Sequence, residues 1–244
     1  MKEVFKLDLL ETVSWVAIAL GILQTAIITI DVIRHPQKMM PIMNIVWPLT
    51  GLYFPLIGIW AYYKLGKSSM DDTDHHRHEH MNHDGHEQME HHGHGEKPFW
   101  QSVFVSTTHC SSGCSLGDMI GVPIVALTGL TIAGTTLLAD YTVEFILAYL
   151  FGIAFQYYGM GFKKHDEPGK AIKNAIKADT WSLIAFEIGM FGWMAIVHYL
   201  LFVEMPAPTT PVFWFMMQIA MMLGFLTSYP ANWILVKKGI KHAM

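Results

Sequence analysis

The residues best suited to chemistry lie in one short string, His-Cys-Ser-Ser-Gly-Cys-Ser-Leu-Gly-Asp, at positions 109–118. It contains both cysteines of the chain, Cys110 and Cys114, with His109 directly before the first and Asp118 four residues after the second. At helical spacing Cys110, Cys114 and Asp118 lie on one face. His109 lies about 100° around the helix from Cys110, so it can join the same site only if the intervening Ser-Ser-Gly run kinks the backbone.

Thiolates and an imidazole together suit soft or borderline metals, Cu(I) or Zn(II), and the carboxylate of Asp118 strengthens the case for zinc. Two alternatives stay open. The cysteines could form a redox dithiol, although thiols one helical turn apart suit two ligands of one ion better than an unstrained disulfide. Alternatively, both cysteines are small buried packing residues. Asp118 still needs a polar partner if it lies inside a membrane.

A second stripe of candidate ligands recurs at steps of three and four residues further along the chain. Its members are Asp179, Leu183, Glu187, Met190, Met194 and His198. A carboxylate, two thioethers and an imidazole on one face would form a path for copper, whereas methionines alone are more often core filler. Two further methionines, Met217 and Met221, share one face of the last apolar segment.

Residues 68–95 have no apolar periodicity and are rich in histidine. The nine histidines of this tract are His75, His76, His78, His80, His83, His86, His91, His92 and His94. We expect a disordered metal-binding loop that captures Zn, Cu or Ni with capacity rather than selectivity, and its Met70, Met81 and Met89 favour copper. The alternative is a solvated linker or a tag, although a tag would be a clean run at a terminus.

Membrane helices must position these residues. The chain has 244 residues, of which 52% are hydrophobic and only 15% are charged, a composition too apolar for a soluble domain of this size. We therefore expect an all-α fold, a polytopic membrane helix bundle of about six transmembrane helices with interfacial or re-entrant helices. Two cysteines cannot form a disulfide framework, and nothing suggests nucleic-acid binding or a nucleotide site.

Six apolar stretches are long enough to cross about 30 Å of hydrocarbon. They are residues 13–33, 42–65, 110–131, 141–162, 179–202 and 212–236. The second carries Pro48 and Pro55 and is predicted to be a kinked helix. Residues 99–108 are assigned to an interfacial or re-entrant piece, because the apolar region from 99 to 134 is too long for one perpendicular helix. Residues 168–178, with lysines at helical spacing, are predicted to form an interfacial amphipathic helix.

Three regions follow from these assignments. Residues 1–67 form an N-terminal two-span hairpin, residues 68–97 the histidine-rich loop, and residues 98–244 a four-span core that carries the Cys/Asp site. With six crossings both termini lie on one side, and the distribution of Lys and Arg makes that side cytoplasmic. We expect a multi-pass plasma-membrane protein with both termini and the histidine-rich loop in the cytoplasm.

The core contains a weak internal repeat. The stretches that follow Pro98 and Pro168 each precede a pair of spans. A parallel duplication of this unit would bring Asp118 and Glu187 to equivalent depths, facing each other.

The string at 109–118, with Ala-Asp-Thr-Trp-Ser-Leu at 178–183 and Gly-Met-Phe-Gly-Trp-Met at 189–194, resembles a bacterial multi-pass membrane family of unknown function. The signature of the resemblance is His-Cys-x-x-Gly-Cys-x-x-Gly-Asp, and it covers the chain from Phe99 onward. Relatives sometimes carry a copper-related label, so the resemblance implies copper handling. The Cys-x-x-x-Cys spacing is also similar to copper motifs of cytochrome-oxidase assembly factors and of the dinuclear copper centre, which sit on soluble domains.

These features predict an integral membrane metal-handling protein that binds, and translocates, copper for homeostasis or resistance. The candidate metal ligands are His109, Cys110, Cys114, Asp118, Glu187, Met190, Met194 and His198, and no catalytic residue is assigned. The expected cofactor is copper, with zinc as the alternative. The expected partners are the lipid bilayer, metal ions, and either a metallochaperone or a second copy of the chain. Two other functions stay open: a membrane oxidoreductase that uses the cysteine pair or a copper centre, and a zinc or nickel transporter.

Overall fold

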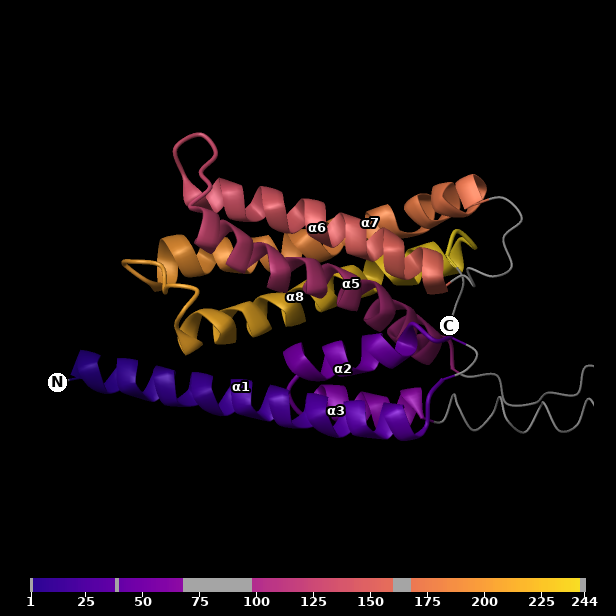
Figure 1. The fold of residues 1–244 in the computed structure, drawn as a ribbon, viewed down its shortest axis with the longest axis horizontal. Coiled ribbons are helices and arrows are strands. Elements are labelled where there is room, and N and C mark those ends of the chain that lie inside the picture. Colours follow the sequence, from indigo (N-terminus) through magenta and orange to yellow (C-terminus); the bar gives the residue numbers. More distant parts are fainter. Residues whose placement is uncertain (1, 38–39, 68–97, 160–167, 242–244) are drawn as a thin grey trace, which may run out of the picture.

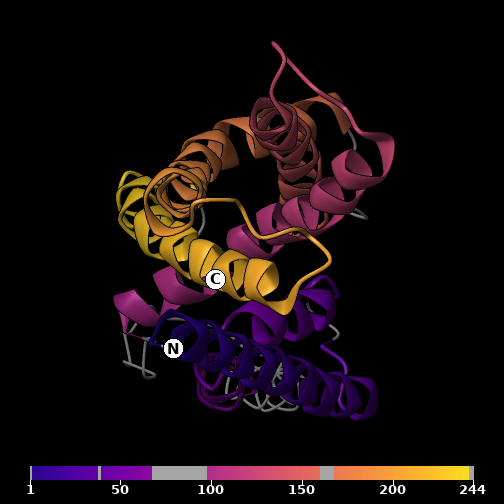
Figure 2. The same ribbon diagram turned by 90° about the vertical axis from the view of Figure 1, so that its left-hand side faces the viewer.

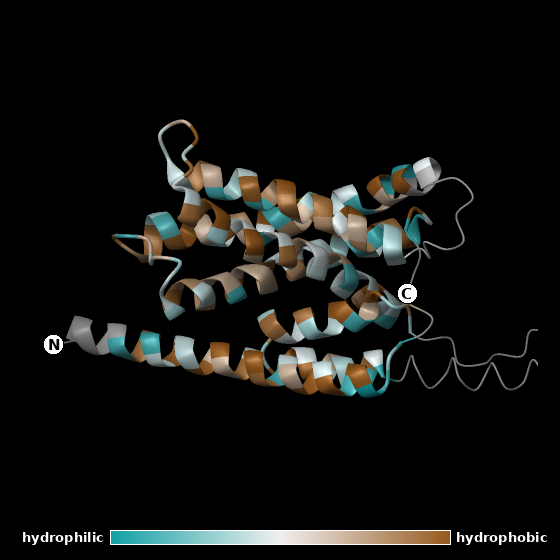
Figure 3. Ribbon diagram, in the orientation of Figure 1, coloured by the Kyte–Doolittle hydropathy of each residue, from teal (hydrophilic) through white to brown (hydrophobic). Residues whose placement is uncertain are grey.

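The computed structural model describes residues 2–37, 40–67, 98–159 and 168–241, and every regular element within them is helical (Figure 1). The elements are α1 (Lys2–Arg34), α2 (Met43–Tyr53), α3 (Ile57–Ala61), the π-helical turn η1 (Tyr62–Gly66), α5 (Phe99–Thr128), α6 (Thr136–Gly159), α7 (Pro168–Ile196), the π-helical turn η3 (Val197–Leu201) and α8 (Pro211–Lys237). The outer faces of the helices are largely hydrophobic (Figure 3), and Leu127 and Ile33 are 88% and 74% exposed. Such a surface suits lipid, and the predicted all-α membrane bundle is confirmed.

Five helices among the described residues are long and apolar enough to cross a membrane. They are Asp8–Arg34, Phe99–Thr128, Thr136–Gly159, Ala175–Leu201 and Pro211–Lys237. The predicted span at 42–65 does not cross. Its first half, α2, is only 11 residues long, and α3 with η1 leads back to the end of the bundle from which α2 started (Figure 1). The prediction of a kinked helix is therefore wrong, and the segment is a re-entrant hairpin.

A glutamine of α1 holds the tip of this hairpin. The helix breaks where Pro55 lacks an N–H and Leu56 adopts a positive φ of 67°. The Gln24 Nε2 group donates to the carbonyl oxygens of Gly51 and, at 2.8 Å, of Phe54. The Oε1 atom of Gln24 accepts the N–H of Leu56 at 3.0 Å. Irregular backbone at membrane depth requires partners of this kind.

The two pieces predicted to be interfacial helices are the first turns of long helices instead. α5 runs unbroken for 30 residues from its N-cap at Pro98, a length of about 45 Å. Residues 99–108 stay helical because they are packed: Val103 is fully buried, and the rings of Phe99 and Trp233 lie 4.7 Å apart. The predicted piece at 168–178 likewise belongs to the continuous 29-residue helix α7.

The core consists of two antiparallel helix hairpins, α5 with α6 and α7 with α8, which lie side by side in both views (Figures 1 and 2). The helices approach closely at glycines. A Cβ added to Gly117 would lie 2.5 Å from the Cα of Ala148, and one added to Gly224 would lie 2.9 Å from the carbonyl oxygen of Phe186. α5 and α7 run in the same direction (Figure 1), which agrees with the expected repeat of two-span units.

The first helix begins at one end of the bundle, and the described chain ends at the other (Figure 1). Five crossings and one re-entrant hairpin require this arrangement. The prediction that both termini share one side of the membrane counted the hairpin as a crossing, and it stays a prediction. The histidine-rich loop and its nine candidate histidines lie outside the described residues.

Candidate functional site

The middle of α5 is buried on every side, because the helix packs against α2, α6, α7 and α8. Its polar side chains are fully buried: Ser106, Thr107, Thr108, His109, Ser111, Ser112, Ser115 and Asp118. Some of the hydroxyls are matched by carbonyl oxygens, as when Thr107 donates to the carbonyl of Val103 at 2.8 Å. We call this column of buried polar side chains, from Ser106 to Asp118 of α5, the polar axis of the otherwise apolar bundle.

Both cysteines are free and fully buried. Because α5 is continuous, their thiols lie one turn apart and interact directly. The Sγ atom of Cys110 lies 3.2 Å from the hydroxyl oxygen of Ser182 on α7. The predicted shared face of the two cysteines is therefore found, and it is turned toward α7.

His109 is not part of that face. Its ring packs 6.3 Å from the ring of Phe155 on α6, and a Cβ on Gly159 would lie 2.7 Å from its Nε2 atom. Neither ring nitrogen has a hydrogen-bond partner among the described residues. The helix does not kink at the Ser-Ser-Gly run, so nothing turns the imidazole toward the thiols.

Three buried carboxyl groups from three helices interact electrostatically about one turn beyond the cysteines, and we call Asp118, Glu144 and Glu187 the acid cluster. Asp118 of α5 interacts electrostatically with both Glu187 of α7 and Glu144 of α6. All three side chains are buried: Asp118 is 0%, Glu144 3% and Glu187 2% exposed. No oxygen of Asp118 or Glu187 has a hydrogen-bond partner in the described part of the chain. Asp118 and Glu187 thus face the same interior region, and their equivalent depth stays a prediction of the repeat.

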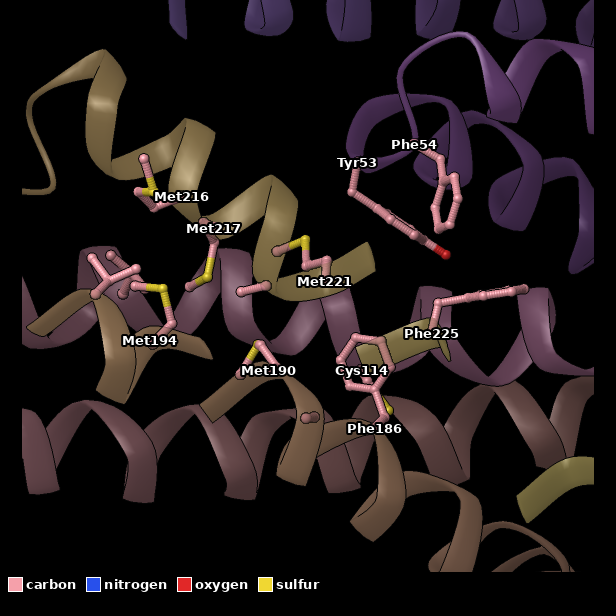
Figure 4. Packing of buried hydrophobic residues seen from close by; sticks show 14 of the residues in the cluster. Tyr53, Phe54, Cys114, Phe186, Met190, Met194, Met216, Met217, Met221 and Phe225 are labelled. Carbon is pink, nitrogen blue, oxygen red and sulfur yellow. The ribbon is translucent and has the colours of Figure 1, made fainter. Parts of the chain in front are cut away.

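Thioether side chains from α7 and α8 belong to the same buried hydrophobic cluster as Cys114, and Figure 4 shows them extending away from Cys114 along these helices. This sulfur cluster comprises Cys114, Met190, Met194, Met216, Met217 and Met221. Met190 and Met217 are 0% and 1% exposed. The candidate ligands Met190 and Met194 therefore share a core with one candidate thiol. His198 lies in the π-helical turn η3, where its ring packs 4.5 Å from the ring of Tyr199.

A buried ion pair closes the end of the polar axis nearest the histidine-rich loop. The Lys241 Nζ group donates to Asp179 Oδ1 and to Asn232 Oδ1, both at 2.8 Å. Ser182 donates to Asp179 Oδ1 at 3.2 Å and also contacts the thiol of Cys110. One hydrogen-bonded network therefore runs from Lys241 to the first cysteine.

Among the residues that the structure describes, no group of three His, Cys, Asp or Glu side chains is placed to hold a metal ion. The predicted ligands instead form separate groups: the thiols, the acid cluster one turn further, and two histidines that point elsewhere. Only thioethers join a thiol in the same core. A site at this place would therefore combine sulfur donors, which are soft ligands.

Three residues of the site were not predicted. Glu144 carried a usable signal, because an ionisable residue inside a span is functional by default. Lys241 gave none, since a lysine after the last span resembles an ordinary flanking charge. Tyr53 belongs to the hairpin tip, and its buried hydroxyl interacts with Cys110 and Cys114; no sequence pattern links residues so far apart.

Residues 99–241, more than half of the chain, match the model of a family described as Domain of unknown function (DUF4396). No curated protein and no solved structure matches the chain.

Proposed function

The chain belongs to the DUF4396 family, and from this premise we propose that it binds copper(I) inside the membrane and moves it along the polar axis. The family description assigns no activity. The bacterial origin and the copper association are parts of the same proposal, and they rest on the resemblance of the string at 109–118. The remaining support comes from the donor atoms of this chain.

The observation that carries the proposal is the sulfur cluster. Thiolate and thioether donors select Cu(I) over harder ions. Cys110 and Cys114 offer two thiols on one face, and five methionines of α7 and α8 belong to the same core as Cys114, namely Met190, Met194, Met216, Met217 and Met221. Carboxylates alone would favour zinc, but the acid cluster lies apart from the thiols by a helical turn.

The depth order of the groups supports transfer rather than storage. From the end near the histidine-rich loop, the groups along α5 and α7 are the Lys241 network, the thiols, the acid cluster and the thioethers. Carboxyl groups without partners are costly in a membrane unless a proton or a cation neutralises them. A row of such groups is typical of an ion pathway.

The charge distribution gives the orientation that we propose. Basic residues concentrate at the end of the bundle where residues 67 and 98 lie: Arg34, Lys64, Lys67, Lys170, Lys173, Lys177, Lys237, Lys238 and Lys241. The links 129–135 and 202–210 at the opposite end contain no Lys or Arg. The positive-inside rule makes the loop end cytoplasmic, so the loop would capture metal from the cytoplasm while α1 begins outside.

Metal content measured by mass spectrometry tests the proposal. The protein is purified in mild detergent with reduced thiols, both as the full chain and with residues 68–97 deleted. We expect near-stoichiometric copper in the deleted form, and its loss when Cys110→Ser and Cys114→Ser are combined.

Methionine substitutions give the matched control. Met190→Leu with Met221→Leu should weaken copper retention, whereas Met43→Leu should not, because Met43 is equally buried (2% exposed) but lies in the separate core of α1 and α2. Copper retention that survives the cysteine substitutions would overturn the proposal, and stoichiometric zinc in place of copper would favour a zinc transporter.

A further inference from the structure

Lys241 is buried more completely than a lysine near a membrane surface normally is. The chain turns at Gly239, whose φ is 66°, and the N–H of Lys241 bonds back to the carbonyl of Leu235 at 3.3 Å. This fold-back carries the side chain into the bundle, where it is 0% exposed. Lysine side chains near helix ends usually extend toward water instead, so its inward course needs a specific partner.

The partners of the ammonium group are held in place by other residues. Asn232 donates its Nδ2 to the hydroxyl of Ser228 at 2.9 Å, which turns its Oδ1 toward Lys241. The hydroxyl of Ser182 fixes Asp179 from the other side. The oxygen cradle, formed by Asp179 Oδ1 and Asn232 Oδ1, is thus organised by bonds that do not involve Lys241.

The charge of the cradle matches one positive charge. Asp179 is its carboxylate, and Lys241 pairs with it at 2.8 Å. Burial alone would lower the pKa of Lys241, but Asp179 outweighs this effect and holds that pKa above its ordinary value. The lysine is therefore charged, and the pair is neutral as a whole. A buried carboxylate that lost its cation would be strongly unfavourable.

Three further atoms near this place lack partners. The Oδ2 atom of Asp179 and both ring nitrogens of His109 are buried without a hydrogen-bond partner within the described ranges. His109 interacts electrostatically with Lys241 and with Asp179. The cradle therefore holds more acceptor capacity than the ammonium group uses.

We propose that Asp179 and Asn232 form a binding site for a small monovalent cation, and that Lys241 fills this site as a tethered cation. A cation that takes the site displaces Lys241 and frees the fold-back after α8, which opens the loop end of the polar axis toward Cys110. The binding site stands independently of copper; only the role of its opening in metal entry rests on the proposed function.

Thermal unfolding of Lys241→Met in detergent tests the site. With the tether removed, Na⁺, K⁺ or methylammonium should raise its Tm saturably, by about 5–10 °C at a hundredfold excess over Kd. N-methylglucamine at matched ionic strength is too bulky to enter and should have no effect. The wild type, and the double variant Asp179→Asn with Lys241→Met, should show no such rise. An equal response to N-methylglucamine, or an equal response of the double variant, would overturn the site.

Thiol labelling tests the opening and does not depend on how stable Lys241→Met is. In a Cys114→Ser background Cys110 is the only thiol of the chain. N-ethylmaleimide should label it about tenfold faster in K⁺ than in N-methylglucamine when Lys241 is intact, and fast in either salt for Lys241→Met. Lys241→Arg should keep labelling slow. Gln24→Leu is a destabilised control. The ratio of its labelling rates in K⁺ and in N-methylglucamine should not exceed the ratio in the parent.

Labelling in the parent that is equally slow in both salts, and unchanged in Lys241→Met, would overturn the opening. None of these readouts uses copper. A protein that binds no copper but responds to small cations would therefore refute the proposed function while supporting the cation site.

Discussion

The N-terminal unit (residues 2–67) and the core (residues 99–241) contain contrasting polar groups: a hydrogen-bonded tip around Gln24 in the first, and the unmatched acid cluster in the second. In the N-terminal unit the backbone is broken, yet Gln24 bonds both arms of the tip, and Asp31 accepts from Tyr62 at 2.7 Å and pairs with Lys67 at 3.3 Å. In the core the helices are regular, yet Asp118 and Glu187 have no partner that the structure describes.

The difference separates structural polar groups from functional ones. A buried polar group that serves the fold is matched by a protein partner, because an unmatched one costs free energy. Groups that stay unmatched in a membrane mark places where ions or protons bind. By this criterion the Gln24 tip belongs to the scaffold, and the acid cluster is where the proposed function would locate a bound ion or proton.

The largest expected effect concerns how the core is held together, since it relies on close helix packing. Gly117→Ala should destabilise the protein by about 3 kcal/mol or more, because the new Cβ would meet the backbone of Ala148 and not a movable side chain. Gly192→Ala is the control: it meets nothing within 4 Å and should be stabilising by about 0.5–1 kcal/mol. Thermal unfolding in detergent measures both, and equal Tm values would contradict the close packing of α5 on α6.

The next effect compares two buried glutamines. Gln24→Leu removes the partners of three backbone groups and should cost about 2–4 kcal/mol. Gln156 of α6 is equally buried at 3% exposure, and its Oε1 atom has no partner among the described residues. Gln156→Leu should therefore change stability by less than about 1 kcal/mol. If Gln156→Leu proved as damaging as Gln24→Leu, the distinction between the two regions would fail.

Substitutions of two aspartates should change the stability of the protein by smaller amounts and in opposite directions. Asp31→Asn weakens an ion pair and a hydrogen bond at a partly exposed site and should cost about 1 kcal/mol. Asp118→Asn removes an unmatched acid and should leave Tm unchanged or raise it, by up to about 1 kcal/mol in stability. Copper retention should nevertheless fall in Asp118→Asn and stay intact in Asp31→Asn. A drop in Tm for Asp118→Asn would show that the acid cluster is structural.

The smallest effect concerns two tyrosine hydroxyls of the hairpin. Tyr62→Phe loses its bond to Asp31 and should cost about 1 kcal/mol. The hydroxyl of Tyr53 lies close to Ser112 and Thr50 but makes no well-formed hydrogen bond in the described part of the chain, so Tyr53→Phe should cost less than about 0.5 kcal/mol. Thermal unfolding of the two variants measures both changes in stability. A larger loss of stability for Tyr53→Phe than for Tyr62→Phe would show that the hydroxyl of Tyr53 is structural.

Helical periodicity was sufficient to predict the buried faces. The stripe from Asp179 to Met194 and the face of Met217 and Met221 are both buried, because residues three and four apart share one side of a helix. The interaction between Asp118 and Glu187 also agrees with the comparison of the two halves of the core. These are local or repeating patterns, which a single sequence displays directly.

Features that depend on contacts between distant residues could not be predicted. An apolar segment with two prolines fits a kinked span as well as a hairpin, and only the bonds from Gln24 decide between them. The course of Lys241 depends on Asp179, 62 positions away. The side to which His109 turns depends on whether the helix kinks, which packing decides.

The hairpin tip also has a consequence for the order in which the protein assembles. Gln24 precedes the tip and is available as soon as the hairpin is synthesised, but Gln218 of α8, which donates to the carbonyl of Leu52 at 2.9 Å, lies 166 residues later in the chain. At about 5–20 residues per second, a ribosome needs roughly 10–30 s to make that stretch. During this interval the carbonyl of Leu52 lacks its final partner, so the tip is completed only when the last helix has arrived.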